Sequence, residues 1–298
     1  MFDLKSYLAA KQILINNFLQ ETIKKTANSG RISEAMEYSL MAGGKRIRPV
    51  LCMAACEAVN GKYQYALPAA CAIEMVHTYS LIHDDLPAMD DDILRRGKET
   101  SHVKYDEATA ILAGDALLTL AFKTLSMAGL SETDGNTALK WLNIICFISR
   151  AAGSEGMIEG QMRDVASEKT ILDFDQLEQI HQLKTGALIK ASVLTGVILG
   201  KGTDEHLQQL KIYGENIGLA FQVADDILNV EGDPIVMGKS AGTDTAHGKN
   251  TYPSLMGLAE SKKFANKLIA RAMNSINSFG TRADPLRAIA SYIIKRKQ

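Results

Sequence analysis

The chain has 298 residues, of which 46% are apolar and 22% charged, a balance typical of a folded globular protein. Its 33 basic residues against 34 acidic ones give a net charge of −1, which excludes a global positive field for binding nucleic acid. Gly and Pro number only 23 and 6, so collagen-like and low-complexity structures are also excluded.

Apolar residues recur at helical spacing along most of the chain, and strand signals are almost absent. Ser33 is interpreted as the N-cap of a helix that stops at Gly43-Gly44. Pro49 fits the first turn of the next helix, which stops near Gly61. Other helices are expected over residues 4–27, 64–86, 107–128, 136–164, 174–200, 204–231, 252–277 and 283–296.

The breaks between these helices are short, and no linker or shift in composition divides the chain. We therefore expect one all-α domain over residues 1–298, built as a large helical bundle. The longest break, 232–250, is rich in Gly and carries Lys239 and Lys249. This composition favours a mobile flap over an anionic ligand.

The sequence predicts neither a membrane span nor an export signal. The nearest apolar run, 187–200, is interrupted by Lys190, and the N-terminal MFDLKSYLAAK lacks the basic start and apolar stretch of a signal peptide. The four cysteines, Cys52, Cys56, Cys71 and Cys146, form no CxxC pair and have no zinc-site spacing. Cys52 and Cys56 share a helix face, and we interpret them as small buried apolar residues in a reducing cytoplasm.

Five carboxylates gather where a strongly apolar helix is expected to end, in the segment HDDLPAMDDD from His83 to Asp92. Negative charge at a helix C-terminus costs about 0.3–1 kcal/mol per group, and like charges this close repel each other. Divalent cations remove both penalties, because Mg²⁺ prefers oxygen ligands and shares phosphate oxygens. A solvated acidic turn explains an isolated run of this kind equally well.

A second acidic pair, Asp225-Asp226, lies inside the apolar segment FQVADDILN rather than on a polar face. Asp225 and Asn229 share a helix face, whereas Asp226 lies about 100° around the axis. Buried carboxylates without partners are costly, so they need a cation. The alternative is a surface pair with a salt bridge. Because the chain contains two Asp-Asp pairs beside apolar helical segments, both the solvated acidic turn and the surface salt bridge become weaker explanations.

Basic residues cluster beside the first acidic segment and in GGKRIRP, which supplies Lys45, Arg46 and Arg48. Arg95 and Arg96 follow the first acidic segment directly. Arg binds phosphate oxygens bidentately, and Lys acts as a point charge. Each alone would be a solvated surface charge, but together with the aspartates they predict a site where two diphosphates meet.

With these motifs the chain resembles the short-chain trans-isoprenyl diphosphate synthases, most closely the bacterial farnesyl diphosphate synthases. HTYSLIHDDLPAMDDDILRRGKETSH resembles the first aspartate-rich motif in its longer bacterial form, and FQVADDILN resembles the second. GMIEGQMRD, at 156–164, resembles the Gly-Gln-Asp helix of the family. The resemblance runs from GGKRIRP near residue 43 to GKNTYPSL near residue 250.

The resemblance implies an all-α isoprenyl synthase (terpenoid synthase) fold around a central apolar cavity. It implies a prenyltransferase that condenses isopentenyl diphosphate with dimethylallyl and geranyl diphosphates to give farnesyl diphosphate. A cytoplasmic homodimer is implied as well. About three Mg²⁺ ions per active site would assist ionisation of the allylic diphosphate. The implied metal residues are Asp84 and Asp90 for two ions and Asp225 for the third, with Asp85 and Asp226 as ligands or their neighbours.

The resemblance also assigns the substrate contacts. The allylic diphosphate would be held by Arg95, Lys184, Lys239 and Lys249. Isopentenyl diphosphate would be held by Lys45, Arg48, His77 and Arg96, with Arg296 closing that site. The developing cation would face oxygens of Lys184, Thr185 and Gln222, and Tyr79 would help form the floor that limits product length.

One position departs from the family pattern, because the second motif usually ends in Asp and here residue 229 is Asn. An Asn offers a carbonyl oxygen without charge. The loss is modest if this position acts through a metal-bound water, and the third Mg²⁺ binds more weakly if it ligates directly.

Four other functions fit part of this pattern. The same chemistry could give a geranyl or geranylgeranyl product. A class I terpene cyclase shares the aspartates but has no use for Lys45, Arg48 and Arg96. A silent subunit of a heteromeric synthase would not need the intact aspartates and arginines, and a di-iron bundle fails because paired Glu-x-x-His ligands are absent from the sequence.

Overall fold

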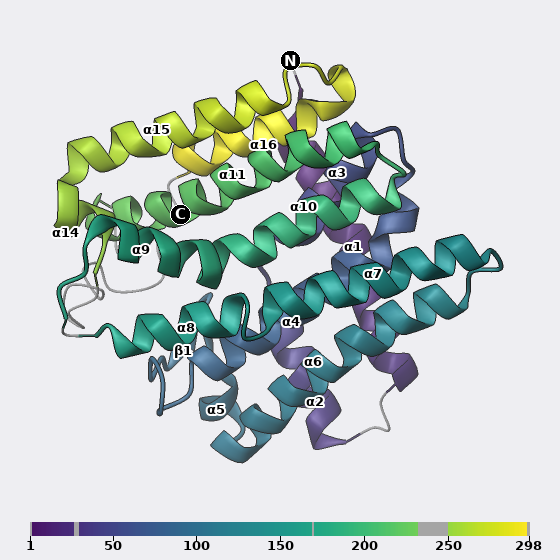
Figure 1. The fold of residues 1–298 in the computed structure, drawn as a ribbon. Coiled ribbons are helices and arrows are strands. Elements are labelled where there is room, and N and C mark those ends of the chain that lie inside the picture. Colours follow the sequence, from purple (N-terminus) through teal and green to yellow (C-terminus); the bar gives the residue numbers. More distant parts are fainter. Residues whose placement is uncertain (1, 27–29, 169, 232–249, 297–298) are drawn as a thin grey trace.

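Helices form nearly all of the chain that the computed structural model describes, residues 2–26, 30–168, 170–231 and 250–296 (Figure 1). The first half contains α1 (Leu4–Thr26), α2 (Arg31–Leu40), α3 (Ile47–Ala58), α4 (Tyr63–Asp84), α5 (Ser101–Lys104), α6 (Glu107–Leu130) and α7 (Gly135–Ala152). The second half contains α8 (Met157–Ala166), α9 (Phe174–His181), the π-helical turn η1 (Gln182–Gly186), α10 (Ala187–Leu199), α11 (Asp204–Glu231), α14 (Tyr252–Met256), α15 (Leu258–Ser275), the 3-10 turn η2 (Thr281–Ala283) and α16 (Asp284–Lys295). Two short strands, β1 (Leu94–Arg95) and β2 (Lys98–Glu99), pair as an antiparallel hairpin. The predicted all-α fold is confirmed.

The start of α2 differs from the prediction. This helix begins at Arg31, with Gly30 in an extended conformation at its N-cap, so the assignment of Ser33 as the N-cap is wrong. The Arg31 guanidinium pairs with Asp106, and its Nε donates to Thr109 Oγ1 at 3.0 Å. Contact with α6 therefore holds the first turn of α2, which local sequence does not reveal.

Three helices predicted as continuous are interrupted. The helix expected over 136–164 ends at Ala152, and α8 begins after Gly156. Gly257 has a φ of +79°, in the left-handed region that favours glycine, and it separates α14 from α15. The helix expected over 174–200 contains the π-turn η1, a feature frequent at functional sites. Hydrophobic spacing survives each interruption, so periodicity alone did not reveal them.

The core lies around α4 and α10. Helix α4 packs against α3 and α6, α10 packs against α3 and α11, and α15 covers α11 (Figure 1). Two stretches, Glu107–Leu130 and Phe174–Leu199, are long and apolar enough to cross a membrane by length and composition, and 50% and 61% of their apolar windows are buried inside the protein. Core helices of soluble proteins pass the same test, so these stretches are weak support for a span.

Three of the four cysteines belong to this core. Cys52 and Cys56 are buried on α3, as predicted, and Cys71 is buried on α4. Cys146 is exposed on α7. Helix α7 packs on the bundle with one face only, and Cys146 lies outside that face.

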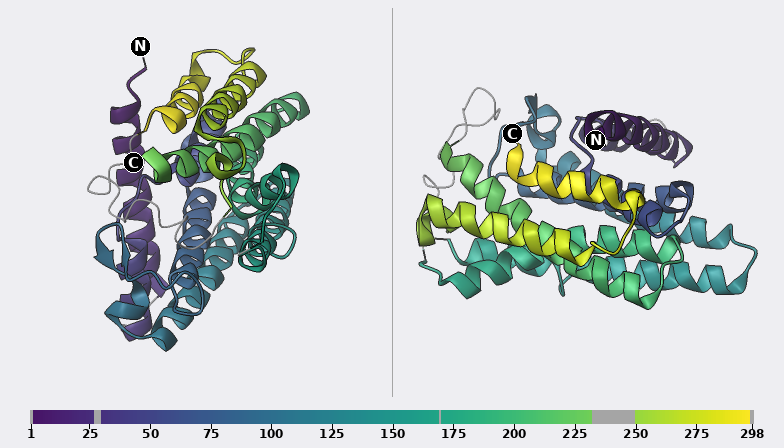
Figure 2. Two further views of the ribbon diagram at one scale, coloured as in Figure 1. Left: turned by 90° about the vertical axis from the view of Figure 1, so that its left-hand side faces the viewer. Right: turned by 90° about the horizontal axis from the view of Figure 1, so that it is seen from above.

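One end of the bundle brings together segments that are distant in sequence. The C-terminal end of the described chain, α14 and the β1–β2 hairpin lie toward the same side, at the left in Figure 1 and at the front in the first view of Figure 2. This end carries the residues of both acidic segments.

Candidate active site

A cavity of about 710 Å³ opens between α4, α8, η1 and α11. Most of the predicted site residues line it, although they come from widely separated parts of the sequence. The predicted residues on its wall are Arg48, His77, Tyr79, Asp84, Arg95, Arg96, Lys184, Thr185, Gln222, Asp225 and Arg296. Lys239 and Lys249, with the predicted flap at 232–250 except Asn250, lie outside the described residues.

Each Asp-Asp pair divides between the cavity and the protein interior. Asp84 and Asp225 line the cavity, whereas Asp85 and Asp226 are only 3% exposed. Successive helical residues point about 100° apart, so only one member of each pair can face the same space. Asp85 accepts hydrogen bonds from Arg95 Nε at 2.6 and 2.8 Å. Asp226 likewise accepts hydrogen bonds from within the protein. These contacts favour the role of ligand neighbour for Asp85 and Asp226.

Burial makes the charged forms of the two cavity-facing aspartates costly. Burial raises the pKa of Asp84 to about 6, against the attraction of Lys184, and repulsion from Asp90 adds to the rise. Burial also raises the pKa of Asp225, opposed by the positive charge of Arg296. A cation between these carboxylates would stabilise their charged forms.

The donor set fits Mg²⁺ in its usual protein environment. Both aspartates offer hard oxygen atoms to one cavity. Within the described ranges, no three His, Cys, Asp or Glu side chains are close enough to form a complete metal cage. Mg²⁺ commonly binds through one or two carboxylates plus waters and substrate phosphates, so an incomplete protein shell is what a diphosphate-dependent site requires. Asp84 and Asp225 would hold the ion.

Two of the predicted allylic contacts are themselves held by carboxylates. Lys184 Nζ lies 2.5 Å from Asp164 Oδ2, and Arg95 also reaches Asp92 at 3.3 Å. Asp164 belongs to the Gly-Gln-Asp motif, for which the sequence indicates no role at this residue. These pairs orient long side chains toward the cavity at reduced conformational entropy.

Three of the four residues expected to hold isopentenyl diphosphate, Arg48, His77 and Arg96, line the cavity. Burial and the nearby Arg48, Arg96 and Arg95 hold the pKa of His77 well below its usual range, so His77 is a neutral hydrogen-bonding group. The Nε of Arg48 is buried without a hydrogen-bond partner in the described part of the chain. Lys45 is not part of the cavity wall, and its Nζ lies 5.4 Å from the centre of the Tyr292 ring.

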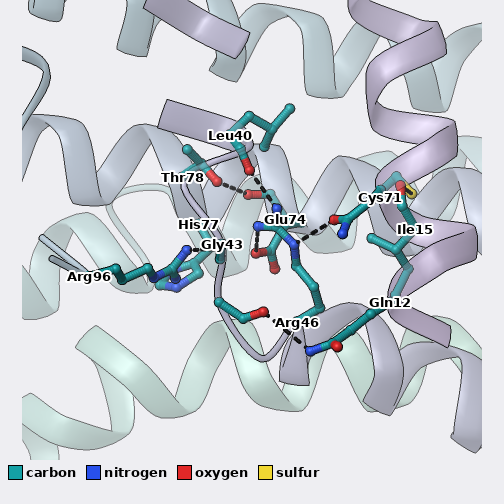
Figure 3. A network of polar contacts seen from close by, with 12 residues as sticks. Gln12, Ile15, Leu40, Gly43, Arg46, Cys71, Glu74, His77, Thr78 and Arg96 are labelled. Atoms are coloured by element: carbon teal, nitrogen blue, oxygen red, sulfur yellow. Dashed lines mark hydrogen bonds and ion pairs between the residues drawn. The ribbon is translucent and has the colours of Figure 1, made fainter. Parts of the chain in front are cut away.

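Arg46 has a structural role that separates it from its neighbours in GGKRIRP (Figure 3). Its buried guanidinium donates to Glu74 Oε1 at 2.7 Å and to the Leu40 carbonyl at 2.5 Å. Arg96 donates to the Gly43 carbonyl, and Gln12 donates to that of Gly44 at 3.3 Å. These bonds fix the glycine loop between α1, α4 and the β1–β2 hairpin. A buried Glu in an apolar helix was the sequence signal for this anchor.

The π-turn η1 lies where two other helices approach it unusually closely. A Cβ on Gly160 of α8 would lie 2.2 Å from the backbone nitrogen of Lys184, and a Cβ on Gly218 of α11 would lie 2.9 Å from Gly186 Cα. Glycines at both positions therefore permit the packing. Thr185, on this turn, donates to Gln222 Oε1 at 3.1 Å.

The apolar wall begins below Asp84. Tyr79, 5% exposed, is just over one turn earlier on α4, and its hydroxyl has no hydrogen-bond partner among the described residues. Its ring meets the His83 ring edge-on at 5.7 Å. The His83 Nε2 lies 3.1 Å from the Ile111 carbonyl, which supports a structural role for this histidine. Four apolar wall residues from α8 were not singled out in the sequence: Met157, Ile158, Met162 and Val165.

Three further residues were missed or only partly anticipated. Gln161 lines the cavity with a buried Oε1 that lacks a hydrogen-bond partner in the described structure. The Phe221 ring lies 4.0 Å below the Arg296 guanidinium, which also pairs with Asp225 at 2.6 Å. Asp90 and Asn229 do not line the cavity, so their predicted metal roles stay predictions.

Residues 29–282 of the chain match a protein family described as "Polyprenyl synthetase". The chain belongs to this family. The match includes both aspartate-rich segments, the glycine loop and the π-turn, so the wall of the cavity is family sequence apart from Arg296.

Several proteins of this family are similar to the present one over almost its whole length. A heterodimeric geranylgeranyl pyrophosphate synthase large subunit from Arabidopsis thaliana chloroplasts is 45% identical over 99% of this chain and 80% of its own. A dimethylallyltranstransferase from Fischerella ambigua is 45% identical over 99% of this chain and 84% of its own. The crystal structure of an FPP/GFPP synthase from Zymomonas mobilis superposes with a TM-score of 0.85 at 37% identity, covering 98% of each chain. The protein is therefore a prenyltransferase of isoprenoid biosynthesis with the isoprenyl synthase fold.

Proposed function

We propose that this polyprenyl synthetase lengthens an allylic diphosphate by adding isopentenyl diphosphate, with geranylgeranyl diphosphate as the final product. The observation that carries the chemistry is the convergence of both aspartate segments and a set of arginines on one cavity with an apolar wall. The cavity, about 710 Å³ in volume, has charged, polar and apolar residues on its wall, as two diphosphates and a hydrocarbon chain require.

In this proposal Asp84 and Asp225 hold Mg²⁺, which would neutralise charge on the departing diphosphate. Arg95 and Lys184 bind its oxygens and stabilise the same charge. Arg48, His77 and Arg96 place isopentenyl diphosphate so that its double bond faces the allylic carbon. The apolar wall excludes water, while Thr185 and Gln222 present oxygens to the cation. The proton lost at the end passes to the released diphosphate, since no cavity side chain is placed as an obvious base.

The choice of product rests on the relatives. Geranylgeranyl synthases dominate the names of the similar proteins, and this favours the alternative over the farnesyl product expected from the motifs. Farnesyl diphosphate remains the second candidate because the bulky ring of Tyr79 lies on the cavity wall, just over one helical turn before Asp84. The name of the Zymomonas mobilis protein includes FPP, which also supports this second candidate.

One incubation separates these outcomes. The protein, Mg²⁺ and isopentenyl diphosphate are combined with dimethylallyl, geranyl or farnesyl diphosphate, and the alcohols are identified after phosphatase treatment. Geranylgeraniol as the longest product supports the proposal, and farnesol as the longest product supports the second candidate. Cyclic hydrocarbons formed without isopentenyl diphosphate, or no product at all, would overturn both.

The assembly is a separate part of the proposal. Large apolar side chains are exposed on the adjacent antiparallel helices α6 and α7: Leu112, Met127, Leu130, Leu139 and Leu142. Large exposed apolar side chains on two adjacent helices favour an interaction surface, and we propose that two copies of the chain pair there. The four cysteines are free, which supports a reducing cytoplasmic location as part of the same proposal.

A further inference from the structure

We propose that Asp226 is a positioning residue that fixes the orientation of the Gln222 amide, so that the amide oxygen faces Thr185 and the cavity. This inference rests on the proposed function, because the oxygen is useful only if a carbocation forms there. It assigns the second aspartate of the second motif a role other than metal binding.

The contacts form a chain from the π-turn to the start of α14. Thr185 Oγ1 donates to Gln222 Oε1 at 3.1 Å, and Gln222 Nε2 donates to Asp226 Oδ1 at 3.0 Å. The other carboxylate oxygen of Asp226 accepts from the backbone N–H of Tyr252 at 3.0 Å. Gln222 and Asp226 are one helical turn apart on α11, so their side chains meet along one face.

The chemistry of the partners determines which way the amide points. The oxygen and nitrogen of a glutamine amide have nearly the same shape, so only hydrogen bonding distinguishes its two orientations. An ionised carboxylate only accepts, so Asp226 requires the NH₂ of Gln222 to face it. The amide oxygen must then point to Thr185, whose hydroxyl hydrogen is drawn toward Gln222. Both groups thereby leave oxygen lone pairs for the cavity.

The same contacts argue against direct metal binding by Asp226. The residue is 3% exposed, and both carboxylate oxygens accept hydrogen bonds from within the protein. Asp225, its neighbour, lines the cavity. A metal at Asp226 would have to reach a buried carboxylate that is off the cavity wall and already accepts from the Tyr252 N–H and the Gln222 amide.

The decisive variant is Asp226→Asn, which has the same shape and lacks the charge. The Tyr252 N–H can only donate, so the oxygen of the introduced amide must remain there and its NH₂ must face Gln222. Gln222 then turns its own oxygen to that NH₂ and its own NH₂ toward Thr185 and the cavity. Because the dipoles facing the cation are reversed, we expect kcat to fall about 10- to 100-fold. The KM of both substrates and the half-saturating Mg²⁺ concentration should stay within about twofold, since neither substrate binding nor the metal site is altered.

The double variant Gln222→Glu with Asp226→Asn tests the orientation itself. The NH₂ introduced at position 226 can donate to one oxygen of the carboxylate introduced at position 222, while the other oxygen accepts from Thr185 as in the parent protein. We expect this exchange to recover at least about tenfold of the lost kcat. A merely structural role for Asp226 predicts that two changes are worse than one.

Thermal melting of each variant shows whether it is folded, and Glu215→Gln, on the exposed face of α11, is the matched control with unchanged kcat. Parental kcat in Asp226→Asn overturns the inference. A higher Mg²⁺ requirement, with kcat restored at high Mg²⁺, assigns Asp226 to the metal instead. If Asp226→Asn does not fold, the double variant decides, and its failure to recover turnover overturns the inference. Inactivity of the parent protein would count against the proposed function and not against this orientation.

Discussion

Arg296 Nη2 lies 2.6 Å from Asp225 Oδ1, so the end of the last helix neutralises the aspartate that faces the cavity in the second acidic segment. The Arg296 side chain is 7% exposed and stacks on Phe221. The family resemblance implies that it closes the isopentenyl site. The structure places its charge beside a carboxylate that we propose as a metal ligand, so a bound Mg²⁺ would compete with the guanidinium for Asp225.

Competition of this kind predicts the effect of Arg296→Gln. Without the guanidinium, Asp225 is free to bind a metal, so the half-saturating Mg²⁺ concentration should fall about two- to fivefold. A Mg²⁺ titration of initial rates measures this, with Arg271→Gln on the exposed surface of α15 as the control. An unchanged or higher Mg²⁺ requirement would contradict the competition.

Asp84→Ala removes the cavity-facing aspartate of the first segment. Because one well-placed electrostatic group contributes about 3–4 kcal/mol to catalysis, turnover should drop at least about a hundredfold with the helical circular-dichroism spectrum retained. Asp175→Ala, on the exposed first turn of α9, should stay within about twofold of the parent. Near-normal turnover of Asp84→Ala would remove this residue from the site.

His181 predicts a pH dependence of stability. Burial lowers its pKa to about 4, with Lys184 adding to the effect of burial and Asp164 opposing it, and both ring nitrogens lack partners among the described residues. The unfolded chain binds the proton with a pKa near 6.5, so it takes up more protons than the folded protein between about pH 4 and 6.5. Stability from the neutral ring is complete above about pH 6.5 and is lost as the pH falls toward 4.

The variant His181→Phe keeps an aromatic ring in contact with Tyr252 and removes the titration. Urea unfolding at pH 7 and pH 4.5 should show that the parent loses about 2–3 kcal/mol more than this variant on acidification. The half-exposed His206, changed to Gln, should leave the parental difference intact. Equal acid sensitivity of parent and His181→Phe would refute the assignment.

Tyr79→Ala should lengthen the product. The ring is 5% exposed in the wall below Asp84, and its removal extends the apolar cavity by the volume of an aromatic side chain. Chromatography of the prenyl alcohols measures the change, and Tyr65→Ala, 55% exposed near the start of the same helix, is the control. The same longest product in parent and Tyr79→Ala would show that another residue forms the floor.

Leu142→Glu should weaken the proposed pairing of two copies. Leu142 is 60% exposed on α7, so a charge there is tolerated in the single chain but not in an apolar interface. Sedimentation velocity should show a shift from dimer to monomer, while Ile13→Glu, similarly exposed on α1, stays dimeric. A parent protein that sediments as a monomer would exclude this assembly.

The sequence by itself determined the all-α class, the two acidic segments and the arginines that serve them. Apolar periodicity reports helices directly, and clustered carboxylates at apolar helix positions require a compensating charge wherever they lie. The family resemblance placed Thr185 and Gln222 in one site, and in the structure they are in hydrogen-bond contact.

The resemblance implied Asp84 and Asp225 as metal residues, but only the tertiary structure gives the reason why these two, and not Asp85 and Asp226, face the cavity. The outcome depends on partners distant in sequence, namely Arg95 for Asp85 and the Tyr252 N–H for Asp226. The Arg296–Asp225 pair and the close approach of Gly160 and Gly218 to the π-turn likewise join residues that are distant in sequence. Local periodicity contains no information about which helices will meet, so these features had to be seen in the fold.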